Sequence, residues 1–251
     1  MILIKNPQEI ETMRKGGQIL ARILNLVAKK VAPGIGTKEL DKLAEDEIRR
    51  AGGFPAFKGY QGFPSTLCTC INSEIVHAPA IPNRKLKDGD IFSIDVGMRW
   101  PAKKGLITDM AKTIPVGKVD KQAKEIMAVT EKSLNLAIKK IKPGVKLGDI
   151  SFAIQQYVEK NKFNVVRELV GHGVGRKLHE EPQIPNYGRK DTGPQLEPGM
   201  TLAFEPMVTA GSFKIELGQD RQTYQTADGS LSAHFEHTIL ITKKGSEVLT
   251  K

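Results

Sequence analysis

The feature that most constrains the fold is an internal repeat at an offset of 110 residues. Residues 23–34 (ILNLVAKKVAPG) match residues 133–144 (SLNLAIKKIKPG) at seven of twelve positions. Further along, residues 86–96 (LKDGDIFSIDV) align with residues 196–206 (LEPGMTLAFEP). Two copies are too few for a solenoid, which needs about three or more repeats. The repeat predicts two similar halves packed about a pseudo-twofold axis.

Both halves show the same order of predicted elements. Asn6-Pro7-Gln8-Glu9 is typical of a capping box with proline at the first helical position, and Pro33-Gly34 is expected to end that helix. Apolar residues at helical spacing predict further helices over 37–50, 121–140 and 147–160. Strands are predicted over 66–72, 90–96, 109–116, 165–169, 201–209 and 234–242. Each half is then helix, helix and strands, which indicates an α+β fold with a largely antiparallel sheet.

No linker or low-complexity segment separates the halves, so we expect one domain over residues 1–251, with halves at about 6–116 and 117–242. Two cysteines exclude a disulfide scaffold. The chain shows no run of about 18 apolar residues that could span a membrane, and its N-terminus is charged too early for a secretory signal. A cytoplasmic location and no membrane partner are therefore expected.

Two acidic residues occupy equivalent positions in the repeat. Asp95 and Glu205 each stand at the polar end of an apolar run, where an unpaired carboxylate would be costly to bury. Asp109 and Glu236 follow the same pattern loosely. Four carboxylates directed at one centre would repel one another unless cations neutralise them, and two divalent ions would balance the charge. The alternative is four unrelated, solvated residues at strand ends.

One histidine favours the metal interpretation. His172 lies between two glycines, which permit close approach of the backbone. An imidazole among oxygen ligands suits a divalent ion such as Mn, Fe, Co or Zn. His179 follows seven residues later, which is not the helical His-Glu-x-x-His zinc pattern. A lone histidine is more often a structural hydrogen-bonding residue than a ligand.

Five segments together carry a family resemblance over nearly the whole chain. They are GYQGFP at Gly59, LKDGDIFSIDVG at Leu86, GHGVGRKLHEEP at Gly171, LEPGMTLAFEPMV at Leu196 and SLSAHFEHTILIT at Ser230. With these five segments in this order, the chain resembles the bacterial type I methionine aminopeptidases. The resemblance implies the pita-bread fold with a dinuclear metal site at its centre. It also implies a single catalytic domain that removes the N-terminal methionine from nascent proteins whose second residue is small.

The resemblance also implies roles for individual residues. The expected metal ligands are Asp95, Asp109, His172, Glu205 and Glu236. Asp109 and Glu236 would bridge two divalent ions, which could be Co, Mn, Fe, Zn or Ni. Glu205 would also exchange a proton with a bridging hydroxide that attacks the first peptide bond. His77 and His179 would contact the substrate and stabilise the tetrahedral intermediate.

A stretch of low charge marks the predicted specificity pocket. Between Gly59 and Asn83 the only charged residue is Glu74. Three residues of this stretch match the pocket of the family: Tyr60, Phe63 and Cys68. A polarisable, apolar lining suits a methionine thioether, although without the resemblance ordinary core packing would be the favoured explanation for Tyr60 and Phe63. The chain departs from the family at residues 99–105, where an extra length of hairpin loop is expected.

Two alternatives fit this sequence less well than the methionine aminopeptidases do, and one partner remains open. X-Pro aminopeptidases and prolidases share the pita-bread fold but carry an additional N-terminal domain. A non-catalytic pita-bread binding module would suit the net charge of +10, but such modules lose metal ligands. The same charge is compatible with a ribosome contact through basic groups at 84–87 and 139–140, or with a merely basic enzyme. We expect a monomer without specific DNA binding.

Overall fold

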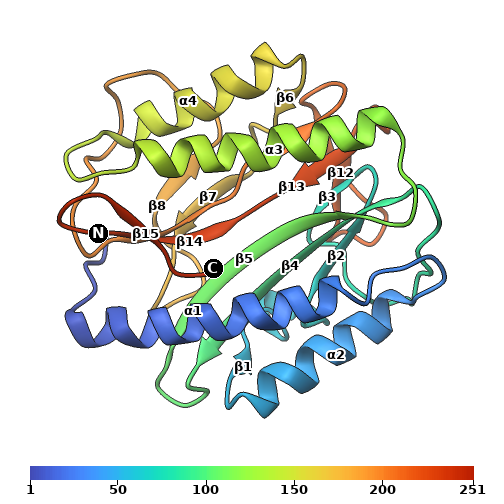
Figure 1. Ribbon diagram of the computed structural model, residues 1–251, viewed down its shortest axis with the longest axis horizontal. Coiled ribbons are helices and arrows are strands. Elements are labelled where there is room, and N and C mark those ends of the chain that lie inside the picture. The colour runs from blue at the N-terminus through green and yellow to red at the C-terminus, as the bar shows by residue number, and fades with distance from the viewer.

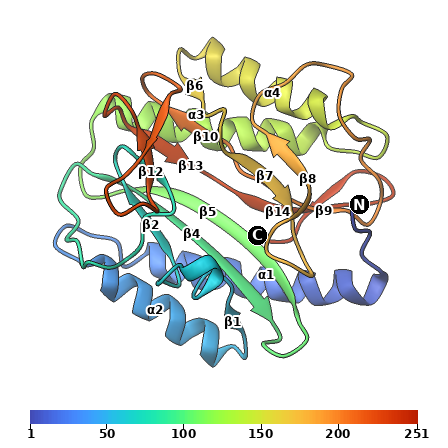
Figure 2. The ribbon, with the colours of Figure 1, turned by 180° about the vertical axis from the view of Figure 1, so that it is seen from behind.

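Four helices lie over a set of antiparallel strands, and the computed structural model describes residues 1–251. The helices are α1 (Pro7–Ala28), α2 (Thr37–Arg50), α3 (Lys121–Lys140) and α4 (Leu147–Lys160). Figure 1 shows α1 and α2 along one half of the molecule and α3 and α4 along the other. From behind, the strands stand in front of the helices (Figure 2). One face of the strand layer is therefore covered by helices.

The strands form two larger and two smaller sheets, all with antiparallel pairing. In the first half, β4 (Ile91–Trp100) pairs with β1 (Phe54–Pro55), β2 (Cys68–Ile71) and β5 (Leu106–Pro115). The five-stranded sheet of the second half has the order β15 (Ser246–Val248), β14 (His237–Ile241), β9 (Thr201–Phe204), β7 (Val170–Gly173), β8 (Glu180–Pro185). The smaller sheets are β13 (Ser232–His234), β10 (Met207–Thr209), β6 (Asn164–Val165), and β11 (Ile215–Leu217), β12 (Tyr224–Thr226), β3 (Glu74–Val76).

Local sequence explains how the helices begin and which faces they bury. The Asn6 side chain accepts hydrogen bonds from the first turn of α1, and Glu9 bonds back to the Asn6 N–H, so the predicted capping box is confirmed. Helices α2, α3 and α4 have the predicted bounds. Helix α1 ends at Ala28, several residues before the predicted stop at Pro33-Gly34. Each helix pair buries its apolar face in a separate cluster, one per half.

Three predicted strands are wrong in their extent. The strand over 165–169 is only β6, and the strands over 201–209 and 234–242 are each broken in two. The first break falls at Glu205-Pro206, where proline cannot donate a ladder hydrogen bond. The second falls at Phe235-Glu236. At both breaks, a residue that carries a carboxylate, Glu205 or Glu236, lies outside the strands on either side.

The extra residues of the first hairpin also differ from expectation. Arg99 pairs with Ile107 and Trp100 with Leu106, so part of the added length extends β4 and β5. The loop itself is residues 101–105. The Trp100 Nε1–H donates to the carbonyl of Ala51, the residue that follows α2, at 3.0 Å. This hydrogen bond attaches the end of the hairpin to the end of the helix.

A local twofold axis lies where the two halves meet. Ala111 on β5 and Glu236 exchange backbone hydrogen bonds, of 2.9 and 3.4 Å. Asp95 stands opposite Ala111 in the β4–β5 ladder, and in the second half the pairing of Phe204 with His237 places Glu205 opposite Glu236. Asp95 and Glu205 are therefore true equivalents, as the repeat predicted. Glu236 is instead the equivalent of Ala111.

Two threonines complete the junction on either side of this axis. The Thr238 hydroxyl accepts from the Asp109 N–H at 2.9 Å and donates to the Asp109 carbonyl at 2.8 Å. The Thr113 hydroxyl makes the same two bonds to His234, of 2.8 and 2.9 Å. The residue equivalent to Asp109 is thus His234. The acidic site is consequently less symmetric than the fold that surrounds it.

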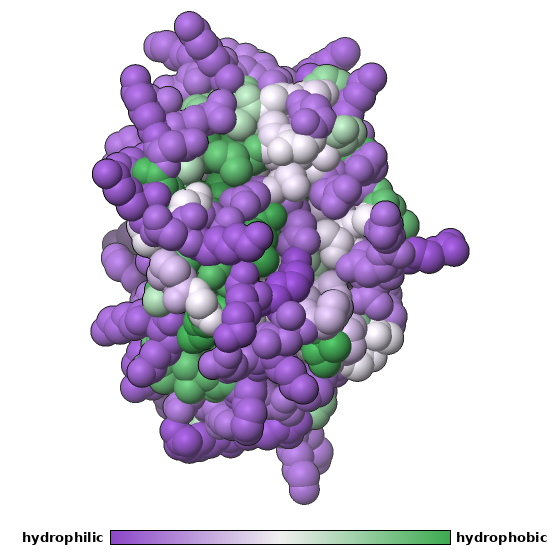
Figure 3. All heavy atoms as spheres, turned by 90° about the vertical axis from the view of Figure 1, so that its right-hand side faces the viewer, coloured by the Kyte–Doolittle hydropathy of each residue, from purple (hydrophilic) through white to green (hydrophobic).

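No helix of this structure combines the length and the apolar character that crossing a membrane requires. Figure 3 shows one side of the molecule, where hydrophilic residues dominate and hydrophobic residues form small separate patches.

Candidate active site

All ten residues singled out from the sequence line one cavity of about 310 Å³. They are Tyr60, Phe63, Cys68, His77, Asp95, Asp109, His172, His179, Glu205 and Glu236. They come from both halves of the chain, since β4 and β5 supply the two aspartates, β7 supplies His172, and the two strand breaks supply the glutamates. The tertiary structure therefore assembles these residues into a single site.

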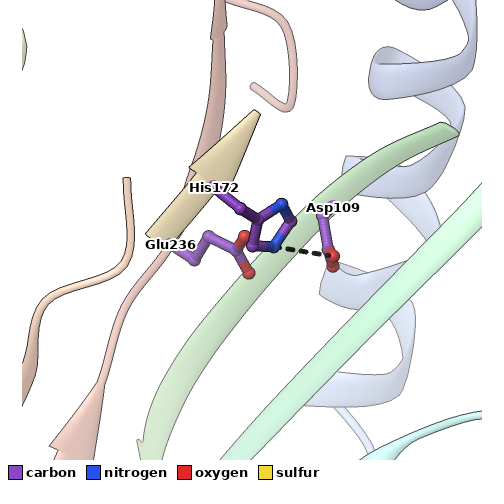
Figure 4. A group of neighbouring side chains, drawn as sticks. All are labelled: Asp109, His172 and Glu236. Atoms are coloured by element: carbon purple, nitrogen blue, oxygen red, sulfur yellow. Dashed lines mark ion pairs between the residues drawn. The ribbon is translucent and has the colours of Figure 1, made fainter. Parts of the chain in front are cut away.

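Three side chains form the tightest group. Ligand-type atoms of Asp109, His172 and Glu236 all lie within 4.8 Å of one another. Figure 4 shows the three side chains pointing toward a common point, with a dashed line from His172 to Asp109. The His172 Nε2 is 4.0 Å from Asp109 Oδ2 and 3.6 Å from Glu205 Oε1. Asp95 lines the same cavity.

Burial makes this acidic cluster unfavourable without a cation. Asp109 and Glu236 are 3% and 2% exposed. Burial, with repulsion from neighbouring carboxylates, raises the pKa of Asp109 to about 8, and burial raises the pKa of Glu205 to about 8. The pKa values of Asp95 and Glu236 are raised for the same reasons. Carboxyl groups in this state would gain from a divalent cation.

Unpartnered atoms support the same conclusion. Asp95 Oδ1, Asp109 Oδ1 and Glu236 Oε1 are buried and have no hydrogen-bond partner. Such orphaned atoms are rare in proteins and call for an explanation such as an ion. The His172 Nδ1 lies 2.8 Å from the Gly173 carbonyl, so the Nδ1–H donates there and the Nε2 lone pair faces the carboxylates. One nitrogen and several carboxylate oxygens form a donor set that suits a divalent metal.

Two further histidines lie beside the acidic cluster. The His179 Nδ1 is 3.1 Å from the Tyr60 hydroxyl, and its ring meets the His172 ring edge-on at 4.5 Å between centroids. His77 adopts a φ of 62°, an uncommon conformation for a residue other than glycine and one often found at functional sites. Burial lowers the pKa of His179, and it lowers the pKa of His77 to about 4. Both imidazoles are therefore neutral at pH 7.

The chain matches the description Metallopeptidase family M24 over residues 11–243. Methionine aminopeptidase 1 of Bacillus subtilis is 50% identical over 252 residues, which cover 100% of both chains. The chain belongs to the methionine aminopeptidases of family M24. A methionine aminopeptidase of Escherichia coli is 42% identical, over 99% of this chain and 94% of the relative. The predicted resemblance and the prediction of an enzyme are confirmed.

Solved structures agree with this membership. A methionine aminopeptidase from Thermotoga maritima superposes with a TM-score of 0.97 at 48% identity, over 100% of both chains. The prolidase from Pyrococcus horikoshii has a TM-score of 0.78 at 22% identity, and this chain covers 64% of it. The second likeness concerns the fold alone. The pita-bread fold class is confirmed, and the chain is a methionine aminopeptidase by family, with metal-dependent removal of N-terminal methionine as its activity.

The structure adds residues that the sequence patterns did not reveal. His234 is 1% exposed, and its Nε2 is unpartnered at 3.4 Å from Glu205 Oε2. In the sequence, only its position two residues before Glu236 suggested that His234 lies at the site. The cavity is also lined by Gln61 and Leu178, which lie within the segments GYQGFP and GHGVGRKLHEEP, and by residues outside the five family-like segments, namely Phe57, Val76, Leu217, Arg221, Gln222 and Tyr224. Tyr224 packs edge-on against His77 at 5.8 Å.

Proposed function

We propose that this methionine aminopeptidase acts through two divalent ions held by Asp95, Asp109, His172, Glu205 and Glu236. The observation that carries the proposal is the group of buried, unpartnered carboxylate oxygens around the Nε2 of His172. A bound pair of divalent ions polarises the scissile carbonyl and lowers the pKa of a water molecule. Co, Mn, Fe, Zn and Ni all suit this mixture of oxygen and nitrogen ligands.

The protein residues supply orientation, hydrogen bonds and proton transfer. Glu205 Oε1 lies 3.6 Å from the His172 Nε2, so this carboxylate is placed at the acidic cluster where it can accept and return a proton. His179 and His77 are neutral and line the same cavity, so each can donate one hydrogen bond to an oxyanion as it develops. The Tyr60 hydroxyl holds the His179 ring from its Nδ1 side.

The remaining wall of the cavity suits a methionine side chain. Tyr60, Phe63 and Cys68 lie there, and Cys68 pairs with Asp95 across β2 and β4. The Cys68 thiol is buried, and burial raises its pKa, so it is a neutral polarisable surface. We propose that methionine enters this side, with the first peptide bond beside the acidic cluster. A limited volume of about 310 Å³ supports the preference for a small second residue.

The direct test is methionine release from Met-Ala-Ser by protein loaded with each metal ion in turn. We expect activity with at least one ion, loss of activity with a chelator, and recovery when the ion returns. Metal analysis of the dialysed protein should give two ions per chain. Asp95→Ala should abolish release, while Asp46→Ala, which removes an exposed carboxylate, should not. Activity of Asp95→Ala at the wild-type level would refute the proposed centre.

A non-catalytic binding module is the competing proposal, and the intact set of acidic and histidine residues argues against it. A ribosome contact is compatible with catalysis. Lys139 and Lys140 line an open groove together with Lys142, Lys160 and Lys190. Arg84 is less available, because it is bonded to Glu74. Co-sedimentation with ribosomes at low salt, lost at high salt, is expected; no co-sedimentation at low salt would refute the contact.

Three further properties are part of the proposal. We propose a single catalytic domain over residues 1–251, a monomer in solution without specific DNA binding, and a cytoplasmic location. The two cysteines are buried and unpaired, which is compatible with a reducing compartment. Sedimentation equilibrium should give a mass near 27.6 kDa, and a single cooperative unfolding transition is expected.

A further inference from the structure

A buried ion pair joins the N-terminal segment to the residue that follows His179. The Lys5 Nζ lies 2.5 Å from Glu180 Oε2, and the two side chains are 1% and 2% exposed. The Lys5 backbone N–H donates to the Gly199 carbonyl at 2.8 Å, which fixes the segment just before α1. Buried ion pairs are uncommon, and breaking one leaves an uncompensated charge. This pair therefore restrains both the N-terminal segment at Lys5 and the chain at Glu180.

The loop before His179 is built around the Lys5 side chain. Gly175 has a φ of 147°, and a Cβ at that position would lie 2.5 Å from Lys5 Cε. The second oxygen of the Glu180 carboxylate, Oε1, accepts from the Lys177 N–H at 3.0 Å. Glu180 thus fastens the turn of residues 177–180 from inside. Because Glu180 and His179 are adjacent, this turn sets the position of the His179 backbone.

Besides this turn, His179 is restrained by the β7–β8 ladder, in which Glu180 pairs with Gly173, and by its edge-on contact with the His172 ring. The His179 Nδ1 contacts the hydroxyl of Tyr60, a residue that is 36% exposed. The same loop has a second tie, from Arg176 to Glu9, with hydrogen bonds of 2.6 and 2.9 Å. The Arg176 side chain is 44% exposed, so this outer tie is expected to contribute little. The buried pair is therefore the stronger of the two side-chain ties of the loop.

We propose that Lys5 is a positioning residue for catalysis, which holds His179 against the acidic cluster through Glu180. The inference rests on the proposed role of His179 in contacting the substrate. It assigns a function to the N-terminal segment, which contributes no metal ligand. Lys5 acts on the reaction only through the loop, so its removal should affect turnover and leave metal binding intact.

The test compares Lys5→Met with Lys5→Arg and with Arg176→Gln, which removes the outer tie of the same loop. With metal-loaded protein and Met-Ala-Ser, Lys5→Met should lower kcat about 10- to 100-fold and change KM less than about threefold. Lys5→Arg should recover part of this loss, and Arg176→Gln should stay within about twofold of wild type. Calorimetric affinity for the metal should be unchanged in all three.

A double-mutant cycle separates positioning from general stability. In a His179→Ala background, Lys5→Met should lower kcat by less than about twofold further, because the residue through which it acts is gone. Losses that multiply in full, or wild-type kcat in Lys5→Met alone, would overturn the inference. If Lys5→Met does not fold, Lys5→Met/Glu180→Gln removes both charges together and is measured in its place.

The two proposals can fail separately. If wild-type protein releases no methionine with any metal, the proposed function fails and the inference fails with it. If wild-type protein is active but Lys5→Met lowers kcat equally with and without His179, only the inference about Lys5 fails.

Discussion

The hydroxyl of Thr238 bonds to both backbone polar groups of Asp109, accepting from the N–H at 2.9 Å and donating to the carbonyl at 2.8 Å. The two residues are 129 positions apart and lie in different halves. Asp109 Oδ2 also lies 4.0 Å from the His172 Nε2. The junction between the halves therefore holds a proposed metal ligand by its backbone.

Thr238→Val is expected to weaken metal binding as well as the fold. The buried Asp109 N–H and carbonyl lose their shared partner, which should lower the free energy of unfolding by about 1–3 kcal/mol. Calorimetry should show metal affinity lowered at least about tenfold, as for other residues that orient ligands. Thr113→Val is the matched control, because it removes the same two bonds from His234 rather than from Asp109. Equal metal affinity in both variants would contradict this role.

Asp109→Asn should trade activity for stability. The substitution removes a buried carboxyl group whose ionisation is opposed by burial and by repulsion from Glu205. We expect activity on Met-Ala-Ser to fall more than about 100-fold, while the metal-free protein melts at a higher temperature than metal-free wild type. Asp46→Asn, at an exposed position, serves as the control in calorimetric scans. A lower melting temperature for metal-free Asp109→Asn would show that the cluster is not under repulsion.

The metal-free protein should lose stability as the pH rises from 7 to 8, a range in which the histidines are neutral in both the folded and the unfolded state. The folded-state pKa values of Asp109 and Glu205 are raised to about 8, well above their values in an unfolded chain. In this window the folded state holds protons that the unfolded state has released, so the free energy of unfolding decreases with rising pH. The melting temperature should drop by about 3 °C or more.

Added metal should reverse this trend. Binding requires ionised carboxylates, so the gain in melting temperature from a fixed concentration of metal should be larger at pH 8 than at pH 7. Thermal scans at both pH values, with and without the ion, measure the effect. A metal-free melting temperature that rises between pH 7 and pH 8 would contradict the assignment of raised pKa values.

Tyr60→Phe should slow turnover without destabilising the protein. The change removes only the hydroxyl that lies 3.1 Å from His179 Nδ1. The loss of one such hydrogen bond, of about 1 kcal/mol, corresponds to a kcat lowered about three- to tenfold. Tyr187→Phe, at an exposed tyrosine that does not line the cavity, should leave kcat unchanged. If both variants have wild-type kcat, the hydroxyl does not orient His179.

Local patterns were sufficient for the helices, except for the end of α1. The Asn6–Glu9 capping box, the apolar spacing of α2 and the bounds of α3 and α4 all follow from interactions within a few residues. Strand extents were less predictable. The breaks at Glu205-Pro206 and Phe235-Glu236 lie where the two glutamates line the cavity. The apolar residues on either side of each break predict one continuous strand and contain no sign of the interruption.

The repeat also misled in one respect. It paired Asp95 with Glu205, and the sheet registers bear this out. It suggested a looser correspondence between Asp109 and Glu236, whereas the equivalent of Asp109 is His234. The insertion that carries β11 and β12 changes the offset in the second half, so a fixed spacing no longer identifies equivalent residues.

By itself, the sequence determined the family, the two-halved α+β fold and the identity of ten residues that line one cavity. These depend on residue types and spacings that are read directly along the chain. Only the tertiary structure decided how the site is held: Thr238 against Asp109, His234 beside Glu205, and Lys5 beneath the loop of His179. Each of these contacts joins segments far apart in sequence or across a strand break. Packing and burial in the folded chain decide which residues meet in these contacts, and no local sequence pattern encodes that choice.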